Sequence, residues 1–227
     1  MKKNRRKAFF YRMSINFAIQ STFMNQAKED LQVIREMMER SSTFLSLSGL
    51  SGVAAGTVAL LAAGVTAFSM NWRIGDGERD LPIPLDSTYH GQSLIGIALV
   101  TLIVALALAL YFTYAKAKRL NISLWNSSAR YFLVHLMIPL VTGGILCLFL
   151  LYHHLFSMTP AATLLFYGLA LVSASKYANQ YIFTLGLSEL ALAFIGLILP
   201  GFGLLLWAIG FGVLHILYGI LMHFKYR

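Results

Sequence analysis

Charged side chains are scarce in this sequence. They make up 12% of its 227 residues, whereas hydrophobic residues make up 58% and the mean hydropathy is +0.69. A soluble domain usually carries about 25% charged residues, which cover its surface. One globule of this size cannot hide so much apolar surface, so we expect most of the chain to face the lipid bilayer.

Cysteine is nearly absent, which excludes several kinds of site. The single Cys147 lies inside an apolar run, so the chain cannot form an intramolecular disulfide, and no Cys/His spacing for zinc is present. The basic start, MKKNRRK, is not followed by an apolar stretch with a small-residue cleavage site. We therefore expect targeting by the first span, and neither a metal nor a cofactor.

Acidic residues are outnumbered by basic ones, 9 against 18, which gives a formal net charge of +9. Such a charge can indicate nucleic-acid binding, but the cations here flank apolar runs and do not form a groove-sized patch with base-stacking aromatics. Anchoring against anionic lipid head groups explains this placement. The bilayer is the expected partner, and nucleic acid is not.

Long apolar runs predict the fold class. Spanning roughly 30 Å of hydrocarbon takes about 20 apolar residues in a helix. We expect an all-α, polytopic transmembrane helical bundle over residues 44–223, preceded by a cytoplasmic basic tail and amphipathic helix at 1–43. The six predicted spans are about 44–68, 93–114, 131–152, 160–176, 181–199 and 202–223. The fourth is short, so a re-entrant hairpin that leaves four full spans is the alternative.

The distribution of Lys and Arg predicts the orientation. If both termini are inside, every Lys and Arg except Arg73 and Arg79 lies in an inside segment. Cytoplasmic loops of membrane proteins carry the Lys/Arg excess. We therefore expect an N-in, C-in arrangement.

Residues 26–44 have the pattern of an amphipathic helix. Apolar residues such as Leu31 and Ile34 recur at helical spacing, and opposite charges lie four residues apart on the other side. Such a helix can lie on the inner membrane surface or dock on a cytoplasmic protein partner. A plain surface helix that leads into the first span is the simpler interpretation. Met24 is an alternative start to Met1.

Small residues at helical spacing predict which spans pack closely. In lipid no hydrophobic effect drives helices together, and small residues let their backbones approach. We expect the first, third and last spans to be central, and the second, nearly all Leu, Ala, Ile and Val, to face lipid. The residues expected to pack are Ser48, Gly52, Gly56, Gly143, Gly144 and Gly210. A homo-oligomer formed through such faces is also possible.

Glu189 is the one acidic residue inside an apolar run. An intramembrane carboxylate costs at least roughly 2.5 kcal/mol at the helix centre, so it should face the bundle and have a partner or be protonated. Glu189 lies roughly 12 Å and His215 roughly 10 Å from the inner face, which brings them to similar depth, and His135 is shallower at about 6 Å. The candidate ligand- or proton-binding residues are Glu189, His215, His135, Ser188 and Tyr218, with Thr184 as a further polar neighbour.

This polar cluster has several interpretations. A Glu–His pair can carry protons or recognise a cationic ligand. Two His and one Glu from three helices have no spacing typical of a metal site. A polar contact that holds three helices together is the structural alternative.

A short string near the start of the first span resembles an enzyme motif. Gly49-Leu50-Ser51-Gly52 is similar to the GxSG motif of rhomboid intramembrane proteases, which also use a histidine on their last core span. That resemblance implies a Ser51–His215 pair. The sequence departs from the family because its serine lies in the first span and the histidine-and-asparagine motif is not recognisable.

A second resemblance covers most of residues 29–219. The stretches EDLQVIREMMERSSTFLSLSGLSG, HLMIPLVTGG and LPGFGLLLWAIGFGVLHILYG resemble those of small multi-span bacterial inner-membrane proteins of unknown function. The resemblance implies a multi-span fold in a bacterial inner membrane. It implies no catalytic residue, substrate or cofactor.

The expected function is a non-enzymatic membrane protein that binds, scaffolds or regulates a partner, with the N-terminal helix and the positive inner surface as its docking side. The alternative is a small proton-linked transporter or permeation unit, with Glu189 as the proton carrier beside His215 and His135. A polar cavity reaching Glu189 from one face would favour transport, whereas helices closed around a Glu–His contact would favour the first. An enzyme ranks third, because no nucleophile, metal or phosphate motif has specific spacing.

Overall fold

The structure is a computed structural model. It describes residues 20, 24, 26, 28, 30–34, 49–69, 87–121, 125, 127–153 and 155–225, with only the backbone for 87–92. The chain divides into two compact units, Met1–Ser42 and Thr43–Arg227. Ser48, the segment 70–86 with Arg73 and Arg79, and most of the predicted N-terminal helix lie outside the described residues. Within the first unit residues 30–34 are helical and exposed.

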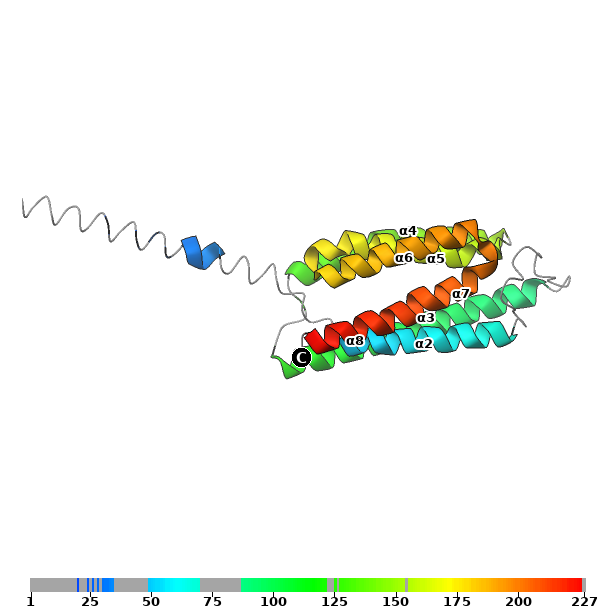
Figure 1. Ribbon diagram of the computed structural model, residues 1–227, viewed down its shortest axis with the longest axis horizontal. Coiled ribbons are helices and arrows are strands. Elements are labelled where there is room, and N and C mark those ends of the chain that lie inside the picture. Colours follow the sequence, from blue (N-terminus) through cyan, green and yellow to red (C-terminus); the bar gives the residue numbers. More distant parts are fainter. Residues whose placement is uncertain are drawn as a thin grey trace, which may run out of the picture. The chain divides into compact units, whose positions relative to one another are not determined.

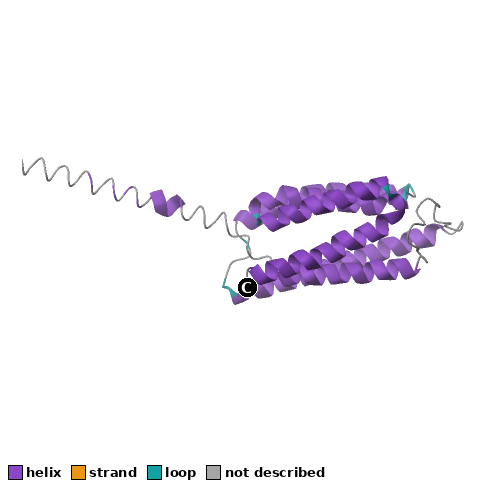
Figure 2. Cartoon of the chain, in the orientation of Figure 1, coloured by secondary structure: helices purple, strands orange, loops and turns teal. Residues whose placement is uncertain are grey.

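Helices form almost all of the described part of the second unit, and no strand occurs there (Figure 1; Figure 2). The α-helices are α2 (Gly49–Ser69), α3 (Ser87–Arg119), α4 (Ser127–Tyr152), α5 (Thr159–Ala174), α6 (Gln180–Ile198), α7 (Gly203–Trp207) and α8 (His215–Lys225). Three 3₁₀ turns, Phe156–Met158, Ser175–Tyr177 and Pro200–Phe202, extend or connect them. A π-helix, Ala208–Leu214, joins α7 to α8.

Six helical segments are long and apolar enough to cross a membrane, as predicted. They are Gly49–Ser69, Ser93–Arg119, Ser127–Tyr152, Phe156–Tyr177, Gln180–Ile198 and Pro200–Lys225. The fourth segment has 22 residues because 3₁₀ turns lengthen α5 at both ends, so its length is sufficient for a full crossing. We call Pro200–Lys225, which contains α7, the π-helix and α8, the sixth span.

Proline and asparagine set the ends of the helices around the site. Pro160 occupies the first turn of α5, where its missing N–H is not needed. The side chain of Asn179 caps α6 by accepting a hydrogen bond from the N–H of Ile182. Pro200 starts the 3₁₀ turn that reverses the chain into the sixth span, as expected of a proline that ends a helix, whereas Pro139 lies inside the continuous helix α4.

The helices pack in two sets that the sixth span connects. In one set α5 packs against both α4 and α6, and in the other α2 packs against both α3 and α8. The sixth span begins beside α5 and α6 and ends beside α2, as its orange-to-red ribbon shows (Figure 1). The central helices are therefore α2, α5, α6 and the sixth span.

Two of the packing predictions hold and one is wrong. The first and last spans are central, and the most apolar window of α3 has no buried residue, as expected for a lipid-facing helix. The third span, α4, is peripheral and packs mainly on α5. Its run of apolar residues carries small side chains, but small residues alone do not determine which face meets a neighbour.

The glycines show where backbones approach closely. A Cβ at Gly52 would lie 3.1 Å from the carbonyl oxygen of His215, and one at Gly56 would lie 2.6 Å from that of Gly212. A Cβ at Gly143 would overlap the ring of Phe166 in α5. The prediction for Gly144 is wrong, because a Cβ there would meet nothing within 4 Å and the residue is exposed.

Candidate functional site

Glu189 lies at the centre of the described bundle. It projects from α6, has 0% of its surface exposed and is one of the two largest fully buried side chains. Its carboxyl group lies against Gly210 of the sixth span, where a Cβ would overlap Oε2 of Glu189 and the side chain of Leu164 in α5. Gly210 is therefore needed at this position because the carboxyl group occupies the space of a side chain.

A close crossing of α5 and α6 places the helices around this carboxyl group. A Cβ at Gly168 would lie 2.9 Å from the carbonyl oxygen of Gly186, and a Cβ at Gly186 would lie 3.0 Å from that of Gly168. Two facing glycines thus let the backbones touch, as in other small-residue helix pairs. Tyr167 and Glu189 both lie within one helical turn of this contact.

His215 joins the three helices through its imidazole ring. Its Nδ1 is 2.9 Å from the carbonyl oxygen of Gly210 and 3.5 Å from Oε1 of Glu189. Its Nε2 is 2.7 Å from the hydroxyl of Tyr167 in α5. Since a carbonyl oxygen only accepts hydrogen bonds, Nδ1 carries a proton, and in the neutral ring Nε2 accepts from the tyrosine hydroxyl.

The two carboxyl oxygens of Glu189 have no hydrogen-bond partner among the described residues. The 3.5 Å separation from His215 is longer than the usual range for a hydrogen bond, 2.7–3.2 Å for N–H···O. An isolated buried carboxylate would lose its hydration without compensation. Two protonation states of the Glu189–His215 contact therefore fit this geometry: a neutral carboxylic acid beside a neutral imidazole, or a carboxylate paired with a protonated imidazole.

Aromatic rings of Tyr167 and Phe211 lie beside the imidazole. The ring of Phe211 lies 4.8 Å from that of Tyr167 and 5.9 Å from that of His215, and Trp207 lies 5.1 Å from Phe211. Phe211 and Trp207 also pack against a buried cluster formed by Leu164, Ala193 and Leu206. This apolar wall keeps the dielectric around the Glu–His contact low, which strengthens each polar interaction inside it.

The backbone of the sixth span is irregular where it meets the site. Residues Ala208–Leu214 form a π-helix, and His215 is the first residue of α8. Turns of π-helix inside α-helices are rare and frequently occur at functional sites. Two glycines, Gly210 and Gly212, lie in this segment and are buried.

The structure gives Ser188, Thr184 and Tyr218 roles other than the predicted network with Glu189. Ser188 and Thr184 donate their hydroxyl protons to backbone carbonyls of their own helix, Ser188 to Thr184 and Thr184 to Tyr181. Tyr218 packs against the core cluster of α4, α5 and α6, which is made of Phe132, Leu171, Ala174, Ile182 and Leu185.

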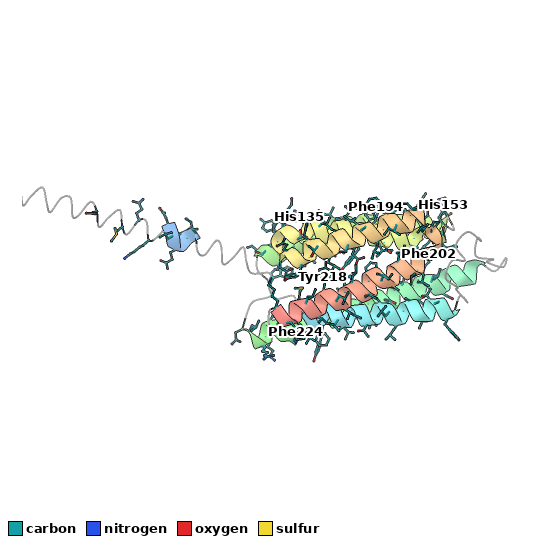
Figure 3. All side chains as sticks on the ribbon, viewed as in Figure 1. His135, His153, Phe194, Phe202, Tyr218 and Phe224 are labelled. Carbon is teal, nitrogen blue, oxygen red and sulfur yellow. The ribbon has the colours of Figure 1, made fainter. Side chains whose placement is uncertain are left out.

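His135 belongs to a separate cluster near the start of α4 (Figure 3). Its Nδ1 is 2.8 Å from the carbonyl oxygen of Tyr131 in its own helix, and its ring lies 4.7 Å from that of Tyr177. The Tyr177 hydroxyl is 3.5 Å from Nε2, and Tyr131 stacks on Tyr177. These contacts fit the shallower position that the sequence predicts for His135.

Sequence reasoning missed Tyr167 and the carbonyl group of Gly210. A tyrosine in mid-span, away from the aromatic belts at the two membrane surfaces, was a signal that could have singled out Tyr167. The carbonyl of Gly210 gives no such signal, because its contact with the imidazole five residues later lies within a π-helical segment that residue types do not reveal.

The structure does not form the Ser51–His215 pair of a rhomboid-like site. Both imidazole nitrogens of His215 contact groups of Tyr167, Gly210 and Glu189. Its backbone carbonyl, not its ring, faces α2, where it lies against Gly52. Ser51 is buried on α2, whereas the imidazole of His215 is directed at α5 and α6.

Acidic, histidine and cysteine side chains are sparse in the part of the chain that the structure describes. No three of them come close enough to hold a metal ion there, and Cys147 is a free thiol. Comparisons with protein families, with curated proteins and with solved structures find no match to the chain.

Proposed function

We propose that the chain is a non-enzymatic, multi-pass protein of a bacterial inner membrane that binds and regulates a protein partner. The observation that supports this best is the closure of the bundle around Glu189, whose surface is 0% exposed. A transported solute needs a polar path to such a group, whereas a contact that holds three helices together needs none. The resemblance of long stretches of the sequence to bacterial inner-membrane proteins supports the location.

The docking surface is the end of the bundle at which α3 and α8 terminate, which we call the basic end. Its described cations are Lys116, Lys118, Arg119, Arg130, Lys176 and Lys225. The sequence contains no Asp or Glu at 115–130, 175–180 or 222–227. An acidic segment of a partner complements this charge, which provides specificity and fast association. The exposed apolar residues Leu31 and Ile34 of the first unit add a second contact surface.

Site-specific photocrosslinking in native membranes tests this proposal. A benzophenone amino acid replaces Trp125, an exposed residue at the basic end, and in a matched control it replaces Leu155, an exposed residue at the opposite end. We expect a discrete protein adduct from the first position, absent from the second and lost when Lys118 and Arg119 are both changed to Gln. Adducts with lipid alone, or an adduct that survives the neutralisation, would contradict the proposal.

A proton-linked transporter or permeation unit is the second candidate, with Glu189 as the proton carrier and with His215 and the shallower His135 on its path. Both oxygens of a fully buried carboxyl group lack hydrogen-bond partners among the described residues, and intramembrane carboxyl groups of this kind are typical of proton relays. The closed bundle then corresponds to an occluded state.

Proton flux into liposomes containing the purified protein tests this candidate. A pH gradient is applied and the internal pH is followed with a trapped dye, for the wild type and for Glu189→Gln. Flux above that of protein-free liposomes, lost in the variant, would support transport. Equal flux in both proteins, or none in either, would exclude it.

A further inference from the structure

The π-helix is the place where the sixth span passes from one set of helices to the other. On one side, Gly210 contacts Glu189 of α6 and Leu164 of α5. On the other, Gly212 contacts Leu60 of α2, since a Cβ there would overlap that side chain. This segment therefore joins α7, which lies beside α5 and α6, to α8, which packs on α2.

In this segment the imidazole of His215 donates a hydrogen bond that a backbone N–H donates in a regular helix. The carbonyl of Gly210 accepts a hydrogen bond from the imidazole of His215, five residues later. The backbone N–H of His215 donates instead to the carbonyl of Gly212. The imidazole thus takes part in the hydrogen bonding of the π-helix.

Nδ1–H of His215 lies near two possible hydrogen-bond acceptors. Nδ1–H of His215 lies 2.9 Å from the carbonyl oxygen of Gly210 and 3.5 Å from Oε1 of Glu189. With a proton on Glu189 the carboxyl group is neutral, and Nδ1–H of His215 donates to the carbonyl of Gly210. Without that proton the carboxylate is the stronger acceptor, because hydrogen bonds to an ionised group are roughly twice as strong as neutral ones.

We propose that Glu189 is a proton-binding site that selects between two hydrogen-bond registers of the sixth span. The structure is the proton-loaded register. When the proton leaves Glu189 for water, Nδ1–H of His215 moves from Gly210 to Oε1. The N–H of Leu214 then leaves its acceptor five residues earlier in the π-helix, the carbonyl of Ile209, and donates to the freed carbonyl of Gly210, four residues earlier, as in an α-helix. The N–H groups before it shift by one residue in the same way, because buried carbonyl groups are almost always paired.

This closure of the π-helix rotates α8 relative to α7. Because α8 packs on α2 through Gly52 and Gly56, the change is transmitted to the set formed by α2 and α3. Proton binding at the buried site then controls the basic end, where α3 and α8 terminate. This switch rests on the second candidate function in one respect: Glu189 must exchange its proton with water, which requires a transient opening of the bundle that encloses it, but no net flux is needed.

The titratable groups around Glu189 are few, so the switch can be assigned to it. Among the described residues, α5 contributes the Tyr167 hydroxyl and the sixth span contributes His215. α2 contains no acidic, basic or histidine residue. α4 contributes His135, which contacts Tyr131 and Tyr177 instead.

The experiment follows the proton and the backbone in the same sample, the full chain in lipid nanodiscs. Infrared spectra follow the protonated carboxyl band, which is identified by its loss in Glu189→Gln. Solid-state NMR with ¹³C-carbonyl glycine and ¹⁵N-phenylalanine follows the Gly210–Phe211 peptide. The only other Gly–Phe pair, Gly201–Phe202, is removed by Phe202→Leu.

In the wild type we expect the Gly210 carbonyl resonance to shift at the pH at which the carboxyl band disappears. In Glu189→Gln, whose amide imitates the neutral acid, the resonance should stay at its acid position at every pH. A band that disappears without a shift, an equal shift in Glu189→Gln, or a band that persists at every pH at which the protein stays folded would each overturn the proposal. The liposome assay tests transport separately. A negative result for transport therefore does not decide whether Glu189 controls the sixth span, and a negative result for the switch does not decide transport.

Discussion

At the scale of single residues, Tyr167 shows how much the polar site contributes to stability. Its hydroxyl is 2.7 Å from Nε2 of His215, and both residues are largely enclosed. Tyr167→Phe removes this hydrogen bond and leaves a buried ring nitrogen without a partner, at an expected loss of about 1 kcal/mol in the free energy of unfolding. Reversible unfolding in mixed micelles measures this loss in the free energy of unfolding.

Tyr177→Phe is the matched control for this substitution. Its hydroxyl lies 3.5 Å from Nε2 of the half-buried His135, so we expect a change within about 0.5 kcal/mol. Equal losses in the two variants would mean that the imidazole of His215 does not depend on Tyr167.

Gly210 can be tested in the same way. In Gly210→Ala the new Cβ would overlap the Glu189 carboxyl group and Leu164, and we expect a loss of about 1–3 kcal/mol from overpacking. Gly144→Ala is the control because its Cβ meets nothing within 4 Å; there the better helix propensity of alanine should leave stability unchanged or raise it by up to about 1 kcal/mol. Similar losses at both positions would contradict the close contact of Glu189 with Gly210.

The sequence indicates some of these residues and not others, for a physical reason. Glu189 and His215 stand out because ionisable groups are rare in apolar runs, and counting the rise per residue places them at similar depth. The same count cannot indicate which side of the helix faces inward, so depth alone does not separate Ser188 and Thr184, which bond to their own backbone, from the buried pair. The Gly210 carbonyl depends on backbone geometry that no residue type encodes alone.

At the scale of elements, the α2–α8 contact is the test of packing through small residues. A Cβ at Gly219 would lie 2.6 Å from the carbonyl oxygen of Gly49 and 2.7 Å from the N–H nitrogen of Val53. We expect Gly219→Ala to lower the free energy of unfolding by about 1–3 kcal/mol, because backbone atoms cannot move aside as a flexible side chain can. The same unfolding assay in mixed micelles measures the change.

Gly64→Ala is the matched variant, on α2 itself, since its Cβ would meet nothing within 4 Å. We expect it to be neutral or slightly stabilising. If it destabilises as much as Gly219→Ala, Gly64 contacts another chain, which would indicate an oligomer that uses this face of α2.

Helix lengths were predictable at this scale, but helix neighbours were not. Hydropathy determines where a chain can cross lipid, and the six spans follow from it. Which helices touch depends on small residues facing each other from different spans, as Gly168 and Gly186 do. The glycines of α4 suggested a central helix, yet Gly144 faces away from every described neighbour.

At the scale of the whole molecule, six antiparallel spans place the connections alternately at two ends. Leu120 and Trp125 lie between α3 and α4 at the basic end, and Leu155 lies between α4 and α5 at the other end. If the fourth segment were a re-entrant hairpin, Lys176 and the α4–α5 connection would lie on the same side of the membrane. The side on which each connection is exposed therefore tests the number of spans and the orientation together.

Cysteine labelling in intact bacterial cells measures this. In a Cys147→Ser background, Leu120→Cys, Leu155→Cys and Lys176→Cys are each treated with a membrane-impermeant maleimide. The excess of Lys and Arg at the basic end predicts that this end lies inside. We therefore expect only Leu155→Cys to be labelled in intact cells and all three to be labelled after permeabilisation.

Labelling of Leu120→Cys and Lys176→Cys but not Leu155→Cys would reverse the orientation. Labelling of Lys176→Cys together with Leu155→Cys would mean that the fourth segment does not cross. Either result would move the basic end, or part of it, away from cytoplasmic partners, and the proposed docking function would fail with it.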